Sequence, residues 1–257
     1  MIAARDLAPS QLDSVLGRTS PLLKLGISVV WLVGLATTVA VVPPLVLTVV
    51  VLSAGLTLGG IARRDLARGL APLWLAAIGL ATFSTLFGAA NSDPTAATIA
   101  QIGPFRITAA ALSAGIGLGF RVAAIGAVGA VFALTTDPTR LVDSLVQQGH
   151  VPERFAYGAL AAYGAVPRFS EDLTTLRQAR RIRGLRGDWH PRLLVSLLVL
   201  AIRHGDRMAI AMDARGFGTV PRTRYRDVRW SWLDLAVGVA AAFALLAGLV
   251  AGARLSP

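Results

Sequence analysis

The sequence contains no cysteine and only three histidines, so it lacks the residues from which disulfides, thiolate nucleophiles and most transition-metal sites are built. Charged residues are also scarce, at 15% of 257 residues, whereas 54% are hydrophobic and the mean hydropathy is +0.64. This balance does not fit a soluble globular domain and favours a membrane protein. The first twenty residues include four charges and no continuous apolar segment, so no cleavable signal peptide is expected.

Acidic residues are the minority among the charges. The chain has 25 Lys and Arg against 14 Asp and Glu, a formal net charge of +11, and almost every basic residue is arginine. An excess of this kind indicates an acidic partner, either nucleic acid or anionic lipid. Because the chain is so apolar, the lipid bilayer is expected as the main partner and nucleic acid is not.

Five apolar segments are expected to cross the membrane as helices, and they predict an all-α polytopic membrane protein. A hydrocarbon core about 30 Å thick needs roughly 20 helical residues. Pro43-Pro44 predicts a turn between the first two segments. The fourth is rich in glycine and alanine and carries Arg121 near its middle. The five segments are 22–42, 45–61, 70–90, 107–134 and 233–253.

The basic residues outside these segments predict the orientation, because short loops rich in Lys and Arg stay in the cytoplasm. Residues 138–229 carry 16 of the 25 basic residues, and the loop between the second and third segments carries three more. The opposite side has only Arg106 and Arg254. We therefore expect a multi-pass protein of the bacterial cytoplasmic membrane with its N-terminus inside and its C-terminus outside. The expected divisions are a four-span region 1–136, a cytoplasmic helical region 137–230 and a last span 231–257.

The cytoplasmic region contains apolar residues at helical spacing and is expected to fold. Asp137-Pro138 starts a short amphipathic helix that Gly149 stops. A second helix is predicted from Pro152-Glu153, bent at Pro167, to a glycine-rich end. A third is predicted from His190-Pro191 to Gly216 or Gly218.

The second and third helices are predicted to end alike, each with an arginine followed by a glycine. An arginine in the last turn interacts favourably with the negative end of the helix dipole, and glycine takes the left-handed conformation that ends a helix. Taken singly, each copy is no more than a helix stop. Together, the two guanidinium groups can bind one acidic partner or two copies of it. The segments are Ala179-Arg180-Arg181-Ile182-Arg183-Gly184 and Ala211-Met212-Asp213-Ala214-Arg215-Gly216.

These two segments resemble the paired Ala-Arg-Gly signatures of the transmembrane component of energy-coupling factor (ECF) transporters, which take up vitamins and transition-metal ions. The similarity is close from about residue 134 to residue 218. It extends to Thr135-Thr136-Asp137-Pro138, Pro152-Glu153-Arg154, and Pro167-Arg168 with Glu171-Asp172. The first signature departs from the family pattern, because Ile182 stands where the family has alanine.

The resemblance implies the partners and the division of labour. In this family, two cytoplasmic ABC-type ATPases, identical or different, bind the coupling helices, and a small membrane protein, the S component, binds the substrate. The ATPase-coupling residues would be Ala179, Arg180, Arg183, Gly184, Ala211, Ala214, Arg215 and Gly216. The chain has no phosphate loop, so ATP would be bound by the partner subunits and the chain itself would need no cofactor.

Arg121 and Pro167 are candidate contacts with the S component or within the membrane. A charge at the centre of a span costs about 2.5 to 3.5 kcal/mol, so Arg121 is expected to face protein or water. The three histidines lie far apart in sequence, and no metal site is predicted. Three alternatives stay open: a permease that binds its own substrate, a five-span membrane enzyme, and a cationic lipid- or nucleic-acid-binding membrane protein. A permease would need polar groups in several spans, and only Arg121 lies deep in one. A membrane enzyme would need clustered acidic, His or Ser/Lys groups, and the third alternative does not explain the duplicated helix end.

Overall fold

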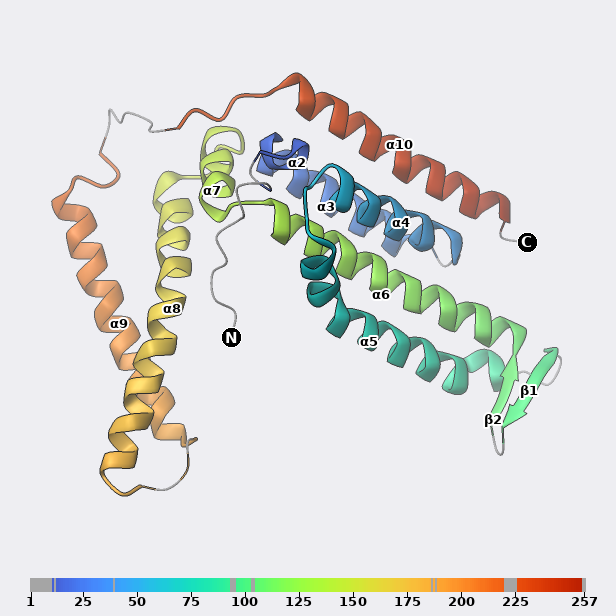
Figure 1. The fold of residues 1–257 in the computed structure, drawn as a ribbon, viewed down its shortest axis with the longest axis horizontal. Helices are drawn as coiled ribbons and strands as arrows, with labels where there is room; N and C mark the ends of the chain where they lie inside the picture. Colours follow the sequence, from blue (N-terminus) through green and yellow to red (C-terminus); the bar gives the residue numbers. More distant parts are fainter. Residues whose placement is uncertain are drawn as a thin grey trace. The chain divides into compact units, whose positions relative to one another are not determined.

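A computed structural model of the chain describes residues 11, 13–38, 40–92, 96–102, 105–185, 187, 189–219 and 226–255. The chain divides into two compact units (Figure 1). The apolar unit comprises the described residues of 7–137 and 229–257, and the hairpin unit comprises those of 138–228.

Five apolar helices make up most of the apolar unit. The short helix α2 (Val15–Arg18) precedes them, and α6 lies between α4 and α5 (Figure 1). A turn of 3-10 helix and an antiparallel strand pair, β1 (Thr98–Ile102) with β2 (Phe105–Thr108), join α5 to α6. The five helices are α3 (Pro21–Ala36), α4 (Val42–Thr57), α5 (Arg63–Phe87), α6 (Ala109–Thr135) and α10 (Trp232–Leu255). The prediction of an all-α polytopic membrane protein is confirmed, although the sequence did not predict the two short strands.

The five apolar helices differ in length. Three of them, α5, α6 and α10, are long and apolar enough to cross a membrane. Helices α3 and α4 have 16 residues each, which is about 24 Å at 1.5 Å per residue and less than the roughly 30 Å of a hydrocarbon core. Pro43 and Pro44 lie in the first turn of α4, where the missing N–H groups need no partner. The structure therefore has three full-length helices and two shorter ones where the sequence predicted five segments.

The core of the apolar unit lies where α3, α4, α5 and α6 meet, and small residues let α5 and α6 approach closely. A Cβ atom added to Gly115 would lie 2.8 Å from the carbonyl oxygen of Ala81, and one added to Gly119 would lie 2.8 Å from the Cβ of the same alanine. Both glycines therefore serve internal helix packing, in the way that small residues do in membrane proteins. The larger buried side chains of this core include Trp31, Leu35, Leu47, Val51, Leu66, Leu70, Val128 and Val131.

Two buried charged residues connect helices that are far apart in sequence. Asp234 is 2% exposed and accepts hydrogen bonds from the backbone N–H groups of Ser20, at 2.6 Å, and Ser231, at 2.8 Å. One carboxylate therefore caps the start of α10 and holds the start of α3 beside it. Lys24 donates from Nζ to the carbonyl oxygen of Thr135 at 2.7 Å, where it satisfies a terminal carbonyl of α6.

The hairpin unit consists of three helices, α7 (Pro138–Gln147), α8 (Glu153–Ile182) and α9 (Pro191–Ala214). The predicted starts are correct, because Pro152 is the N-cap of α8 and His190 is the N-cap of α9. Asp143 of α7 accepts a hydrogen bond from the hydroxyl of Tyr157 of α8 at 2.8 Å. Figure 1 shows α8 running away from α7 and α9 returning alongside α8.

Candidate functional site

The two arginine-glycine segments form the same local structure. Arg183 is the C-cap of α8 and Arg215 is the C-cap of α9. Each following glycine has a left-handed backbone, with φ of 72° at Gly184 and 68° at Gly216. The glycine N–H donates to the carbonyl three residues back, at 3.0 Å in α8 and 2.9 Å in α9. The next N–H donates to the carbonyl five residues back, at 3.2 and 3.0 Å. Both ends are Schellman motifs, as the sequence predicted for helices stopped by glycine.

Both C-cap arginines are exposed, and neither guanidinium group makes a hydrogen bond or ion pair within the part of the chain that the structure describes. Ile182, the residue that departs from the family pattern, is 86% exposed. Its larger side chain therefore meets no packing limit inside this chain. Near the end of α9, Ile210 is 69% exposed. Each helix end therefore has an exposed arginine beside an exposed isoleucine.

The two ends lie at opposite ends of the hairpin formed by α8 and α9. The ring of Phe169 in α8 packs edge-on against His204 in α9, at a centroid distance of 6.3 Å. Each of these residues lies thirteen positions from the loop that joins the helices. A Cβ atom on Gly218, just beyond α9, would lie 2.5 Å from Nε of Arg154, in the first turn of α8. The end of α9 is therefore next to the start of α8, and far from the end of α8.

The distance between the two arginines follows from helix geometry. Helix α9 has 24 residues, and at 1.5 Å per residue this separates Arg215 from the loop beside Arg183 by about 36 Å. A single small acidic site cannot contact both guanidinium groups. Of the two arrangements that the sequence left open, the structure favours one partner site for each arginine.

The other predicted coupling residues surround these two ends. Ala179 and Arg180 are half-buried near the end of α8, whereas Ala211 and Ala214 are exposed on the last turn of α9. Nε of Arg180 is buried without a hydrogen-bond partner among the described residues. Pro167 is exposed in the interior of α8, where it leaves one helical hydrogen bond unmade.

Arg121 lies near the midpoint of α6, as predicted. Its side chain is half-buried, and its Nε is buried with no hydrogen-bond partner in the described part of the chain. The structure brings it together with none of the other predicted site residues, since it belongs to the apolar unit and they belong to the hairpin unit.

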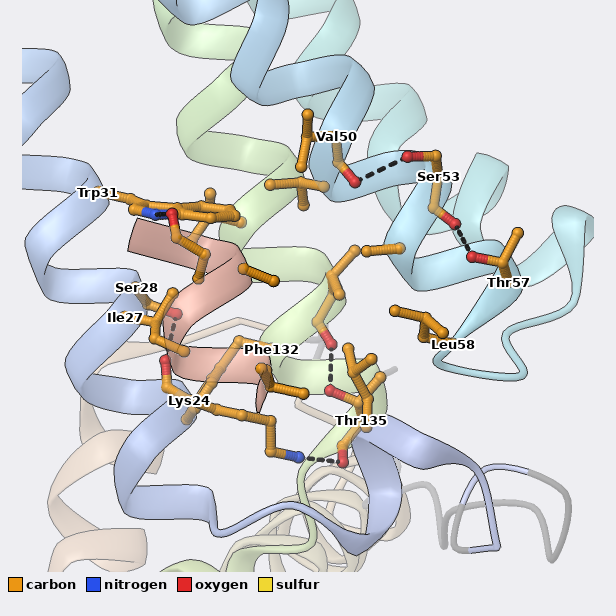
Figure 2. A pocket seen from close by; sticks show the side chains of 18 residues that line it. Lys24, Ile27, Ser28, Trp31, Val50, Ser53, Thr57, Leu58, Phe132 and Thr135 are labelled. Carbon is orange, nitrogen blue, oxygen red and sulfur yellow. Dashed lines mark hydrogen bonds between the residues drawn. The ribbon is translucent and has the colours of Figure 1, made fainter. Parts of the chain in front are cut away.

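The apolar unit contains a cavity of about 310 Å³ between α3, α4, α6 and α10 (Figure 2). Four hydroxyl groups line it, and each donates to a carbonyl of its own helix: Ser28 to Lys24, Ser53 to Val50, Thr57 to Ser53 and Thr135 to Val131. Nζ of Lys24 points to the carbonyl oxygen of Thr135. Sites for polar ligands present a few convergent polar groups. Here each hydroxyl hydrogen is engaged within its own helix, and the rest of the lining is mostly apolar.

No group of three or more metal-ligating side chains occurs among the described residues. Nδ1 of His190 accepts a hydrogen bond from the N–H of Arg192 at 3.1 Å, so this histidine acts as a helix cap.

Two functional features were missed at the sequence level: the buried Asp234 and the buried Lys24. Ser231 and Asp234 have the spacing of a capping box before an apolar run. The N-terminal cap of α10 could therefore have been predicted from the sequence. The bond from Asp234 to Ser20 joins residues 214 positions apart, and no local pattern announces it. Lys24 lies in the predicted segment 22–42, and no local pattern indicates that it is 7% exposed and bonded to α6.

The fold and the site together define a helical membrane protein that carries a hairpin with an exposed arginine at each end. A model of the CbiQ family, described as cobalt transport protein, matches residues 17–225, and the chain belongs to this family.

The similar proteins all carry one name, energy-coupling factor transporter transmembrane protein EcfT. The protein from Heliobacterium modesticaldum is 32% identical over 190 residues, which cover 67% of this chain and 69% of the relative. The protein from Listeria innocua is 28% identical over 59% of this chain, and the match spans 63% of that relative, less than two thirds of its length. The protein from Lactococcus lactis is 26% identical over 70% of this chain and 73% of the relative.

These comparisons confirm the family that the two arginine-glycine segments indicated. They also confirm the prediction that the chain is not an enzyme, because the relatives are named as transmembrane components of a transporter. Its location in a membrane agrees with the apolar helices.

Proposed function

We propose that this chain is the energy-coupling transmembrane subunit of an ECF-type importer and that each arginine-glycine end binds one ABC-type ATPase. The observation that carries the proposal is the pair of identical, exposed arginine caps at opposite ends of one hairpin. Two ATPase subunits would offer two separate sites, and a separation of about 36 Å along α9 lets each arginine occupy one of them.

The chemistry of each end suits an acidic groove. An arginine fork binds carboxylates in a bidentate fashion, and the rigid Schellman turn fixes the direction from which it leaves the helix. Nucleotide-driven closure of the two ATPases would then move the two ends of the hairpin together. That motion would pass through α7 and the ends of the apolar helices to a separate membrane subunit that holds the substrate.

The substrate class follows from the family and not from the cavity. The family model is described as a cobalt transport protein, and the named relatives are ECF transporter components. We therefore propose a transition-metal ion or a vitamin, bound by the separate S component. The orientation belongs to this proposal, with the hairpin unit and the N-terminus in the cytoplasm and the C-terminus outside.

The test is co-purification of the ATPases with the tagged chain from native membranes. Truncating one partner of a desolvated charge pair costs roughly 2 to 5 kcal/mol, so Arg183→Ala and Arg215→Ala should each reduce ATPase recovery and the double variant should abolish it. Arg203→Ala removes an exposed arginine from the middle of α9 and should leave recovery unchanged. Membrane insertion should be normal in all four variants. ATPase recovery by the double variant equal to that of the parent chain would refute the proposal.

A further inference from the structure

Arg121 lies at the edge of an open face of a membrane helix, and its Nε makes no hydrogen bond within the part of the chain that the structure describes. On α6 it shares one face with Ala114, Ile125 and Gly129, at spacings of seven, four and eight residues, and all three are exposed. A Cβ atom on Gly129 would meet nothing within 4 Å. The glycines that pack against α5 occupy a different side of α6. This side of α6 is therefore open within the apolar unit, and Arg121 lies at its edge, because Gly117, Ala124 and Val128 on the neighbouring side are buried.

The guanidinium group lies too deep to reach the lipid headgroups. Arg121 is twelve residues from the start of α6 and fourteen from its end, about 18 and 21 Å along the axis. The helix exceeds a core of about 30 Å by roughly 5 Å at each end. Six bonds of about 1.5 Å carry an arginine side chain roughly 7 Å, which leaves it several ångströms short of either boundary.

The anion that neutralises this charge cannot come from the helices of this chain. Within α3, α4, α5, α6 and α10, the acidic residues are Asp65 and Asp234, which lie in the first turns of α5 and α10. A second copy of the chain also lacks acidic residues in the middle of its helices, so a homodimer would bring no carboxylate to the depth of Arg121. An unpaired arginine here would cost about 2.5 to 3.5 kcal/mol.

We propose that the open face of α6 binds a transmembrane helix of a different protein, and that an Asp or Glu at mid-depth of that helix pairs with Arg121. This inference deepens the proposed function, because it takes the separate membrane subunit of that assembly as the partner. Small residues on either side of Arg121 let the partner helix approach closely, and burial between two helices strengthens the ion pair.

The experiment uses the full complex from native membranes. A photo-crosslinking side chain at Ile125 should capture a membrane subunit, and sequencing the crosslinked peptide should show an acidic residue within a span. Arg121→Met should reduce recovery of that subunit by at least about tenfold while the ATPases are retained. Arg121→Lys should retain part of the recovery. Arg106→Met removes the same charge from β2, outside the helices, and should leave recovery unchanged.

Reversing the charges of Arg121 and of the captured acidic residue tests whether the two form an ion pair. Arg121→Glu should release the membrane subunit, and an Arg in place of the captured acidic residue should restore its recovery. Removing Arg121 lowers the cost of membrane insertion, so loss of the partner would not reflect a failure to insert. The proposal is overturned by full recovery with Arg121→Met, by a captured span without an acidic residue, or by a change confined to the retained lipids. Failure of the unaltered chain to recover any ATPase would count against the proposed function, and capture of an acidic span at Ile125 would still support this pairing.

Discussion

At the scale of single residues, the glycine after each C-cap arginine is as specific a requirement as the arginine itself. A residue with a Cβ pays about 1 to 2 kcal/mol to adopt a left-handed backbone. An added Cβ at Gly184 would meet nothing within 4 Å. The cost of alanine at Gly184 is therefore purely conformational. A changed backbone at this position would alter the direction in which the Arg183 side chain points.

We expect Gly184→Ala and Gly216→Ala each to destabilise the hairpin end by about 1 kcal/mol. Gly205→Ala offers a control of opposite sign, because Gly205 lies inside α9 with open space around it and alanine favours a helix by roughly 0.5 to 1 kcal/mol. Hydrogen exchange at the N–H groups of Leu185 and Phe217, which close the two Schellman turns, measures the effect directly. Slower exchange in the two end variants than in the parent chain would contradict this reading.

Residues whose structure depends on local patterns could be predicted from the sequence, and residues that act over long distances could not. The starts of α8 and α9 and the left-handed glycines follow from signals within a few positions. The burial of Lys24 could not be predicted, because nothing near it in the sequence indicates its partner. The carbonyl it caps belongs to Thr135, 111 positions away. Arg121 was placed correctly, and only the structure showed that its face of α6 is open.

At the scale of helices, the separation between α5 and α6 is set by the glycines of α6. Gly115 lies against the backbone of α5, where an added Cβ would be 2.8 Å from the carbonyl oxygen of Ala81. Because lipid tails are as apolar as the packed side chains, close van der Waals contact is what holds such helices together. An added methyl group would therefore separate the two helices at this point.

Gly115→Ala should destabilise the apolar unit by roughly 1 to 3 kcal/mol, the usual range for overpacking. Gly129→Ala, on the open face of the same helix, should be neutral or slightly stabilising in the isolated chain. Thermal unfolding in detergent, followed by helical circular dichroism, separates the two outcomes. Equal stability of the two variants would mean that α5 and α6 do not pack as closely as the structure has them.

Helix boundaries were the least predictable element-scale feature. The predicted segment 22–42 ran past the end of α3 at Ala36 to Val42, the first residue of α4, because the apolar composition continues across the break. The predicted span at 70–90 began too late: α5 starts at Arg63, and the basic residues assigned to a loop form its first turns. Arginine is a good helix former, so charge alone did not mark the end of the helix.

At the scale of the whole molecule, the orientation depends on the parity of the crossings. Helices α5, α6 and α10 are long enough to cross, whereas α3 and α4 are short. The pair α3 and α4 adds either two crossings or none, and both cases leave an odd total. The proposed orientation therefore has the start of α3 and the end of α10 on opposite sides of the membrane, and the basic residues between α6 and α10 favour the cytoplasm for that region.

The absence of native cysteine makes this orientation directly measurable. In intact cells, a membrane-impermeant maleimide should label Ile99→Cys on β1 and Arg254→Cys near the end of α10. Ser170→Cys on α8 should react only after the membrane is permeabilised. Thr37→Cys, between α3 and α4, then separates the two cases: labelling from outside means that the pair crosses fully, and protection means that it re-enters on the cytoplasmic side. Labelling of Ser170→Cys in intact cells would reverse the topology and would place both arginine caps out of reach of any cytoplasmic ATPase.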